Sequence, residues 1–240
     1  MPTNSTSKKK ISFWSRVFDL IAPRACVICG DRLALEENTI CGKCNMHLPR
    51  TEYHLNPYEN EMAKLFWAQV PIERATAFFY YEGHSQVSNI LYALKYGNHP
   101  EIGIVMGRML GREIVGSGFF EDIDIIIPIP LAHKRRRQRG YNQSLMIAKG
   151  ISEITQIPIN NKIVNRLSFS ESQTHKDRWG RSENVKGVFL LEDGDVIRNK
   201  HILIVDDVVT TGATVISCSK ELMKAESVKI SVISLGFAKS

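Results

Sequence analysis

The strongest constraint on the fold is an alternation of short apolar runs with segments of helical periodicity, which begins near residue 75 and continues to the C-terminus. The run 123–130 (IDIIIPIP) is too hydrophobic for an exposed edge, so we expect it to be buried on both faces. The alternation predicts an α/β fold with a mostly parallel sheet flanked by helices on both faces. The expected strands are 75–83, 123–130, 187–192, 201–205 and 228–237, and the expected helices are 85–97, 102–110, 141–155 and 213–225.

Length and charge allow several classes of ligand. The chain has 240 residues, which suits one large domain or a medium domain with a small one. Its formal net charge of +6 is compatible with a phosphorylated metabolite or with nucleic acid. No apolar run approaches the roughly 20 residues that span a bilayer. Trp14, Val17, Phe18 and Ile21 have helical spacing, so we expect a short amphipathic helix, no membrane insertion and a cytoplasmic location.

Four of the five cysteines form two CxxC pairs, Cys26 with Cys29 and Cys41 with Cys44. Two such turns can direct four thiolates at one ion, which is the spacing of a structural zinc knuckle. A closed site of four thiolates leaves no open position for chemistry, so we expect the zinc to stabilise folding. The lone Cys218 lies on the apolar face of its expected helix and is interpreted as a buried core thiol.

The stretch HILIVDDVVTTGAT (201–214) joins an apolar strand to a helix through two acids, three threonines and a glycine. Ligands of open α/β sheets bind beyond the carboxyl ends of the strands. The backbone N–H groups of such a turn and the helix N-terminus can hold a phosphate, while carboxylates suit sugar hydroxyls or a water-bound magnesium ion. For Asp206 and Asp207 alone, a turn followed by a helix cap would be the simpler interpretation. The whole pattern of acids, threonines and glycine instead predicts a 5-phosphoribosyl ligand.

The same stretch resembles the phosphoribosyl pyrophosphate motif of type I phosphoribosyltransferases. Together with the four cysteines and three further segments, it makes residues 23–238 similar to the ComF/GntX family of competence-related phosphoribosyltransferase-like proteins. Those segments are LKYGN (94–98), IPIPLAHKRRRQRGYNQS (127–144) and RLSFSESQTHKDRWGRSENVKGVF (166–189).

The resemblance implies a pocket in which Asp206 and Asp207 are catalytic and several segments bind phosphoribosyl pyrophosphate with Mg²⁺. The segment 168–186 would be a mobile lid over that pocket. For Lys95, a favourable position at a helix C-terminus is an equally good explanation. The basic stretch 133–139 is interpreted as a loop, either merely solvated or forming an electrostatic funnel. The expected binding residues are Val208, Val209, Thr210, Thr211, Gly212, Ala213, Thr214, Pro130, Leu131, Lys95, Arg139, Asn142, Gln143 and Arg178.

The resulting hypothesis is displacement of pyrophosphate from ribose C1 by an acceptor that the sequence does not identify, in a protein linked to DNA uptake. The alternative is a non-catalytic accessory protein that binds the phosphoribosyl ligand or single-stranded DNA, although few aromatic residues interleave with the basic ones. A ligand-sensing transcriptional regulator is weaker, since no helix-turn-helix is evident. The expected organisation is 1–22 as a tail with a short helix, 23–50 as the knuckle, 51–70 as a linker and 71–240 as the phosphoribosyltransferase-like domain.

Overall fold

The computed structural model describes residues 24–167 and 188–238, and the chain divides into two compact units, 1–48 and 49–240. The described part of the first unit holds the short helix α2 (Gly42–Met46) and an antiparallel bridge between Ala25 and Arg32. The helix expected at 14–21 lies outside the described residues. Within the described ranges, no helix combines the length and the apolar character needed to cross a membrane.

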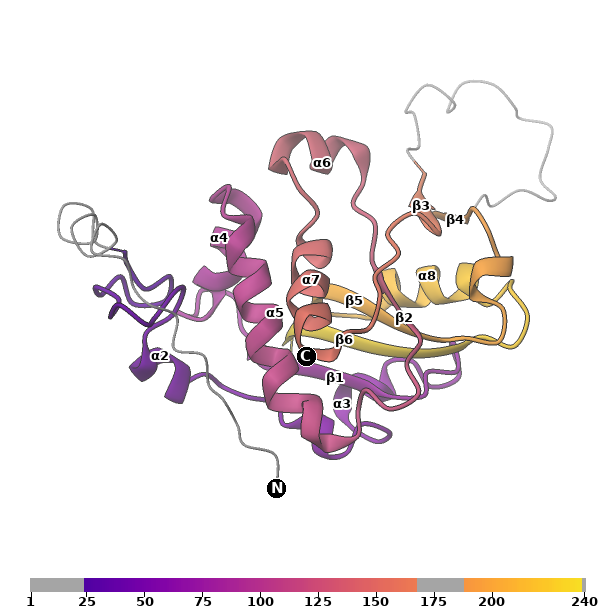
Figure 1. The fold of residues 1–240 in the computed structure, drawn as a ribbon, viewed down its shortest axis with the longest axis horizontal. Helices are drawn as coiled ribbons and strands as arrows, with labels where there is room; N and C mark the ends of the chain where they lie inside the picture. The colour runs from indigo at the N-terminus through magenta and orange to yellow at the C-terminus, as the bar shows by residue number, and fades with distance from the viewer. Residues whose placement is uncertain (1–23, 168–187, 239–240) are drawn as a thin grey trace. The chain divides into compact units, whose positions relative to one another are not determined.

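The second unit is built on a parallel sheet of four strands (Figure 1). Its spatial order is β1 (Ala75–Tyr81), β6 (Lys229–Ala238), β5 (His201–Val209) and β2 (Ile125–Pro128). Every neighbouring pair is parallel, which brings the carboxyl ends of β2 and β5 to the same edge of the sheet. The α/β fold class predicted from the alternating pattern is confirmed.

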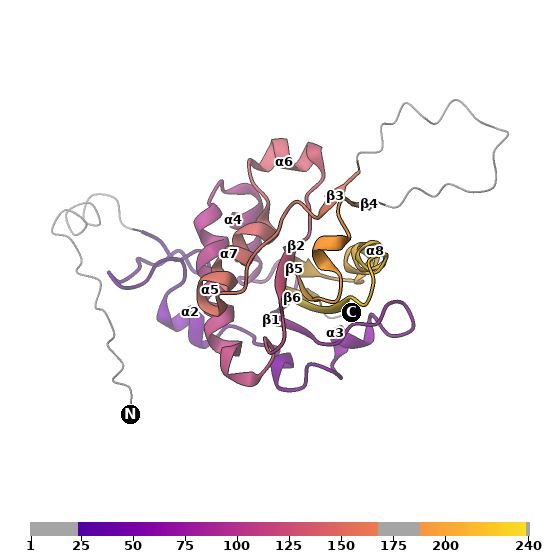
Figure 2. The ribbon, with the colours of Figure 1, turned by 45° about the vertical axis from the view of Figure 1, so that its right-hand side comes forward.

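Helices cover both faces of this sheet, as predicted. Figure 2 shows α5 (Pro100–Ile114) and α7 (Gln143–Thr155) on one side and α8 (Ala213–Leu222) on the other. α4 (Ser88–Tyr96) packs beside α5. The face under α8 holds a large apolar core that includes Cys218, which is fully buried as predicted.

The helices α5 and α7 approach each other so closely that glycine is required between them. A Cβ atom on Gly107 would lie 2.2 Å from the carbonyl oxygen of Ile147, and one on Gly150 would lie 2.1 Å from that of Ile104. At these two positions backbone therefore packs against backbone, with no side chain between the helices to adjust.

The strand β2 is the last in the sheet order, yet all of its residues are buried. The segment that follows α7 covers its outer edge: the Ile126 N–H donates to the Pro158 carbonyl and the Asn160 N–H donates to the Ile126 carbonyl. Burial of this run was predicted correctly, and a bridging segment rather than a further strand supplies it.

The structure departs from the predicted organisation at residues 51–70, which were expected to form a linker. They instead form η1 (Tyr53–Leu55) and α3 (Glu61–Lys64) and contribute Tyr53, Met62 and Phe66 to the core. The apolar side chains are spaced among polar ones so that one side of the segment can pack under the sheet, and burial of that side fixes its conformation.

Two further segments also differ from expectation. The basic stretch predicted as a loop is a helix, α6 (His133–Arg139), which ends where Gly140 adopts a φ of 77°. Lysine, arginine and glutamine are good helix formers, and this run contains little else. The run 187–192 gives β4 (Phe189–Leu191), which pairs antiparallel with β3 (Val164–Arg166) outside the main sheet. The remaining short turns are η2 (Val115–Ser117) and η4 (Asp195–Ile197).

Candidate functional site

The two adjacent acids lie inside a strand, near its C-terminal end, rather than after it. β5 continues to Val209, four residues beyond the predicted end at Val205. Because side chains alternate along a strand, Asp206 and Asp207 point in different directions. Asp206 is buried and accepts a hydrogen bond from Ser144 Oγ at 3.2 Å, while the Asp207 carboxylate lies 3.1 Å from Lys95 Nζ.

Their surroundings give the two carboxyl groups different properties. Burial, and secondarily the negative charge of Asp207, raises the pKa of Asp206 from 3.8 to about 7. The hydrogen bonds from Ser144 and from the Asp207 N–H oppose that rise. Asp207 is paired with a lysine and accepts from the Val208 N–H at 2.8 Å. The site thus combines one acid that is readily protonated near neutral pH with one held beside a cation.

The turn after β5 is held open by Gly212, which precedes α8 with a φ of 73°. A Cβ at this position would also lie 3.0 Å from the ring of Phe66, so both the backbone conformation and the space require glycine. A small cavity of about 40 Å³ lies inside the turn and reaches the first residues of α8, where backbone N–H groups are free of intrahelical partners. It is lined by Asp206, Val208, Val209, Thr210, Thr211, Gly212, Ala213, Thr214 and Val215.

A second cavity, of about 170 Å³, joins this turn to the end of β2. Its lining combines the two acids with cationic side chains, one of which, Lys95, contacts Asp207 at 3.1 Å. The carboxylates can accept from sugar hydroxyls, while the cations can bind anionic groups of the same ligand. Among the predicted residues, it brings together Lys95, Pro130, Leu131, Arg139, Gln143, Asp206, Asp207, Val208 and Thr214. Arg178, predicted from the resemblance, lies outside the described residues, as does the expected lid.

Asn142 and Gln143 hold the cavity wall in position. The Asn142 Oδ1 accepts from the Ser144 N–H and caps α7, while its Nδ2 donates to the Ile129 carbonyl at 2.9 Å. The buried Gln143 accepts from Arg139 at 3.1 Å. Asn142 therefore connects α7 to the end of β2. Gln143 lines the cavity that holds the two acids, whereas Asn142 does not.

Several residues of the site were not predicted. Ser144, Arg135 and Arg166 line the cavity with the acids. Burial, followed by the charge of Arg135, lowers the pKa of Arg166. Ser144 stands in the RGYNQS stretch, but nothing in that pattern shows that its hydroxyl meets an acid 62 residues away.

The first unit brings its four cysteines together. The sulfur atoms of Cys26, Cys29, Cys41 and Cys44 all lie within 4.8 Å of one another, and those of Cys29 and Cys41 are 3.8 Å apart. Tetrahedral coordination with metal–sulfur bonds near 2.3 Å requires sulfur atoms roughly 3.8 Å apart. The donors and their spacing therefore fit a tetrahedral metal site.

Backbone donors and an acidic side chain order this cluster. The Cys41 N–H points at the Cys26 sulfur at 3.3 Å and the Cys44 N–H at the Cys41 sulfur at 3.4 Å. Glu37 accepts from the Ala34 and Gly42 N–H groups, and these bonds lower its pKa. The neighbouring His47 hydrogen-bonds to the Lys43 carbonyl and is not part of the cluster.

Comparison with known proteins shows what the chain is similar to. Residues 142–238 match the family described as phosphoribosyl transferase domain. DNA utilization protein YhgH of Escherichia coli strain K12 is 27% identical over 202 residues, covering 83% of this chain and 84% of the relative. Competence protein F of Haemophilus influenzae is 26% identical over 212 residues, covering 83% and 90%. The resemblance noted from the motifs is confirmed by these matches and by the four-cysteine cluster.

Two solved structures are also similar. A purine phosphoribosyltransferase from Pyrococcus horikoshii is 14% identical with a TM-score of 0.34, covering 56% of this chain and 81% of that one. A hypothetical protein from Neisseria gonorrhoeae with bound ppGpp is 20% identical with a TM-score of 0.36, covering 58% and 69%.

Proposed function

We propose that this homologue of competence and DNA utilization proteins, whose second unit carries a phosphoribosyl transferase domain, binds phosphoribosyl pyrophosphate with Mg²⁺ and transfers the phosphoribosyl group to an acceptor. The observation that supports the proposal is that Asp206, Asp207, the glycine turn and the end of β2 line two neighbouring cavities, which share Asp206, Val208 and Thr214. These cavities offer a partner to each part of a ligand that carries a 5′-phosphate, vicinal hydroxyls and a second anionic group: the turn, the two acids and the cationic side chains, respectively.

Each wall has a distinct role in this proposal. The backbone N–H groups of the turn 210–214 hold the 5′-phosphate at the N-terminus of α8. Asp206 and Asp207 accept from the ribose hydroxyls and favour positive charge on the ring as the bond at C1 breaks. Lys95 and Arg139 face the leaving diphosphate. Burial of Asp206 strengthens its interaction with the developing charge, because the surrounding dielectric is low.

Magnesium, when bound with the diphosphate, supplies further neutralisation of the leaving group. The carboxylate of Asp207 offers the oxygen donors that this ion prefers, but one of its oxygens already contacts Lys95. The residues present therefore fit a contact through water more readily than a dedicated protein cage.

Thermal unfolding in phosphoribosyl pyrophosphate, with and without magnesium, tests the proposal. A ligand at about 100 times its dissociation constant stabilises a protein by roughly 2.7 kcal/mol. We expect a magnesium-dependent stabilisation that the double variant Asp206→Asn with Asp207→Asn lacks. Asp122→Asn is the matched control, because this exposed acid precedes β2 at the opposite end of the strand. The absence of a shift in folded wild-type protein would refute the ligand.

Turnover is tested separately by release of pyrophosphate. With an acceptor present, Asp207→Asn is expected to abolish release while its unfolding midpoint stays near that of the wild type. An undiminished rate in this variant would remove the acids from the mechanism and leave a binding protein.

We also propose that the four-cysteine cluster of the first unit holds a structural Zn²⁺. The support is the sulfur spacing, which fits a tetrahedral ion, and the N–H groups directed at two of the sulfurs. All four positions are filled by thiolates, so the ion stabilises the fold and takes no part in the transfer.

A second candidate function, binding of single-stranded DNA, is supported by a surface beside the same cavity. Tyr92 and Tyr96 on α4 are exposed at 67% and 57%, and their ring centroids are 5.0 Å apart. The Arg139 guanidinium lies 5.4 Å from the Tyr96 ring, at the end of the basic helix α6. The aromatic groups that the basic stretch lacks are thus supplied by a helix about 40 residues earlier. Stacking rings beside cations are what sequence-independent single-strand binding uses.

Fluorescence anisotropy of labelled oligothymidylate tests this candidate. We expect Tyr92→Ala with Tyr96→Ala to weaken binding by at least tenfold, since one stacked base contributes about 1–3 kcal/mol. Tyr58→Ala, which removes another tyrosine exposed at 64%, should leave the affinity unchanged. Binding that does not fall with added salt would count against phosphate contacts altogether.

A further inference from the structure

The largest of these cavities lies beside the acid-lined one and has no part in the proposed transfer. Its volume is about 240 Å³, and it is bounded by the end of β2, the start of α7, the helix α6 and the strand β3. It meets the acid-lined cavity at Pro130, Leu131 and Arg166. Ligand pockets for drug-sized molecules are typically about 300–1,000 Å³, so this one suits a single small ring.

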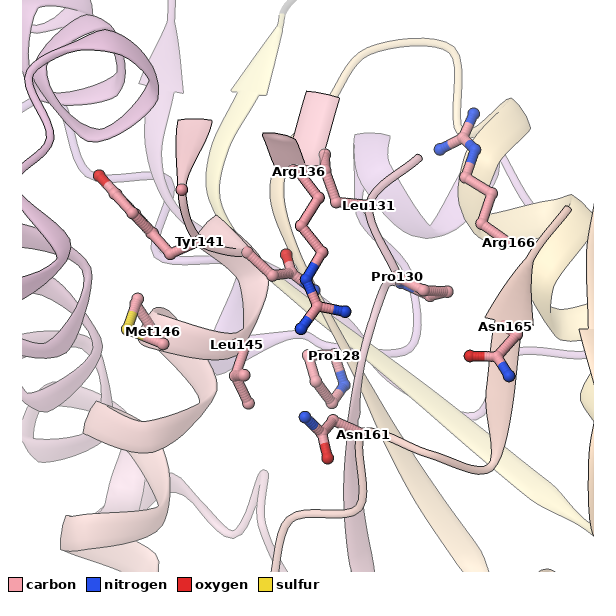
Figure 3. Close-up of a pocket in the computed structure, with 12 residues that line it drawn as sticks. Pro128, Pro130, Leu131, Arg136, Tyr141, Leu145, Met146, Asn161, Asn165 and Arg166 are labelled. Carbon is pink, nitrogen blue, oxygen red and sulfur yellow. The ribbon is translucent and has the colours of Figure 1, made fainter. Parts of the chain in front are cut away.

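The lining of the cavity combines apolar side chains with one guanidinium, that of Arg136, directed toward them. Pro128, Leu145 and Met146 form part of the lining. Figure 3 shows the Arg136 guanidinium directed from α6 toward Pro128 and Asn161, whereas the Arg166 guanidinium points away. The lining contains no aspartate or glutamate. A guanidinium beside apolar side chains favours a flat, negatively charged group, because it can stack on a ring and bind a carboxylate through two hydrogen bonds.

Two polar side chains of this cavity are available to a ligand. Within residues 24–167 and 188–238, the side chains of Arg136 and Asn161 have no hydrogen-bond or ion-pair partner. The Asn165 amide, by contrast, donates to Glu192 at 2.7 Å, and the Arg166 guanidinium lies 5.3 Å from the Phe189 ring centroid. The free amide of Asn161 offers both a donor and an acceptor, which is the complement of a ring edge carrying N–H and C=O groups.

We propose that this cavity is a separate binding site for a small heterocyclic acid, with Arg136 binding the acidic group and Asn161 the polar edge of the ring. The ring itself lies against the apolar side chains of Pro128 and Leu145. The proposal does not depend on the transfer reaction, because Arg136 and Asn161 line this cavity and do not line the cavity that holds the two acids.

Two pairs of probes that differ in one charged group test the proposal: orotate against uracil, and nicotinate against nicotinamide. Ligand-detected NMR titrations are made on the full chain without phosphoribosyl pyrophosphate or magnesium. We expect each acid to bind at least tenfold more tightly than its neutral partner, since a charge-assisted hydrogen bond is about twice as strong as a neutral one. Equal affinities, or no binding by any probe, would overturn the site.

Matched variants then locate the preference. Arg136→Gln and Asn161→Asp are expected to abolish it, the first by removing the cation and the second by placing a carboxylate at the ring edge. Arg137→Gln removes a cation from the next position of α6, which does not line the cavity, and should retain it. Equal losses in Arg136→Gln and Arg137→Gln would mean that the basic helix attracts acids without a defined site. The probes carry no phosphoribosyl group, so the two proposals can fail independently. Absence of probe binding would not affect the magnesium-dependent stabilisation by phosphoribosyl pyrophosphate, and absence of that stabilisation would not affect probe binding.

Discussion

Replacing Asp206 with asparagine is expected to stabilise the ligand-free protein, and to do so increasingly as the pH rises toward 7. The carboxyl group is buried at 8% exposure beside a second acid, so its ionised form is unfavourable in the folded chain. Asparagine has nearly the same shape and keeps an oxygen that can accept from Ser144 and from the Asp207 N–H.

The sign and size follow from the proton affinity of the two states. Because the pKa of Asp206 is raised in the folded state, the folded protein binds this proton more tightly than the unfolded chain does. Its favourable contribution is complete below 3.8, falls as the pH rises and is lost above about 7. At about 1.4 kcal/mol per pH unit, the difference between wild type and variant should grow by something on the order of 4 kcal/mol across this window.

Urea unfolding of both proteins from pH 4 to pH 9, without magnesium, measures this difference. Thiol and histidine titrations are common to both proteins and cancel. Asp122→Asn, an exposed acid, should follow the wild type throughout. Parallel stability curves for wild type and Asp206→Asn would show that the carboxyl is not desolvated, and the electrostatic account of the site would fail with them.

Three other perturbations have defined outcomes. Elemental analysis should find one zinc ion per chain, and Cys44→Ser should lose it together with the ordered structure of the first unit. Gly107→Ala should lower the unfolding free energy in urea by about 1–3 kcal/mol or more, whereas Gly111→Ala, whose new Cβ meets only a side chain at 3.2 Å, should change it far less. Lys95→Met should weaken phosphoribosyl pyrophosphate binding by at least tenfold, as measured by calorimetry. Lys220→Met, on the exposed side of α8, should leave this affinity unchanged. Equal affinities of wild type and Lys95→Met would show that Lys95 does not bind the phosphate groups.

The sheet and the turn after β5 could be predicted because their signals are local. Continuous apolar runs mark buried parallel strands, and the acids, threonines and Gly212 stand together in ten residues. Their shared location at one sheet edge then follows from the parallel topology.

The elements that sequence reasoning missed depend on contacts between distant segments. Residues 51–70 become ordered only because Tyr53 and Phe66 have a sheet to pack against. Tyr96 comes beside Arg139 only because the fold brings α4 and α6 together. The helix α6 could have been predicted from the high helix propensity of its residues, but the strong charge of the run suggested a solvated loop.

The contact between Gly107 and Gly150 has a consequence for which parts of the site can move. Helices that touch through their backbones cannot slide without a steric clash, so α5 and α7 behave as one rigid body. Asn142 fastens the end of β2 to that body through the Ile129 carbonyl. The wall of the acid-lined cavity formed by α7 and the end of β2 is therefore rigid. Any rearrangement that accompanies ligand entry has to occur in the segments that face this wall.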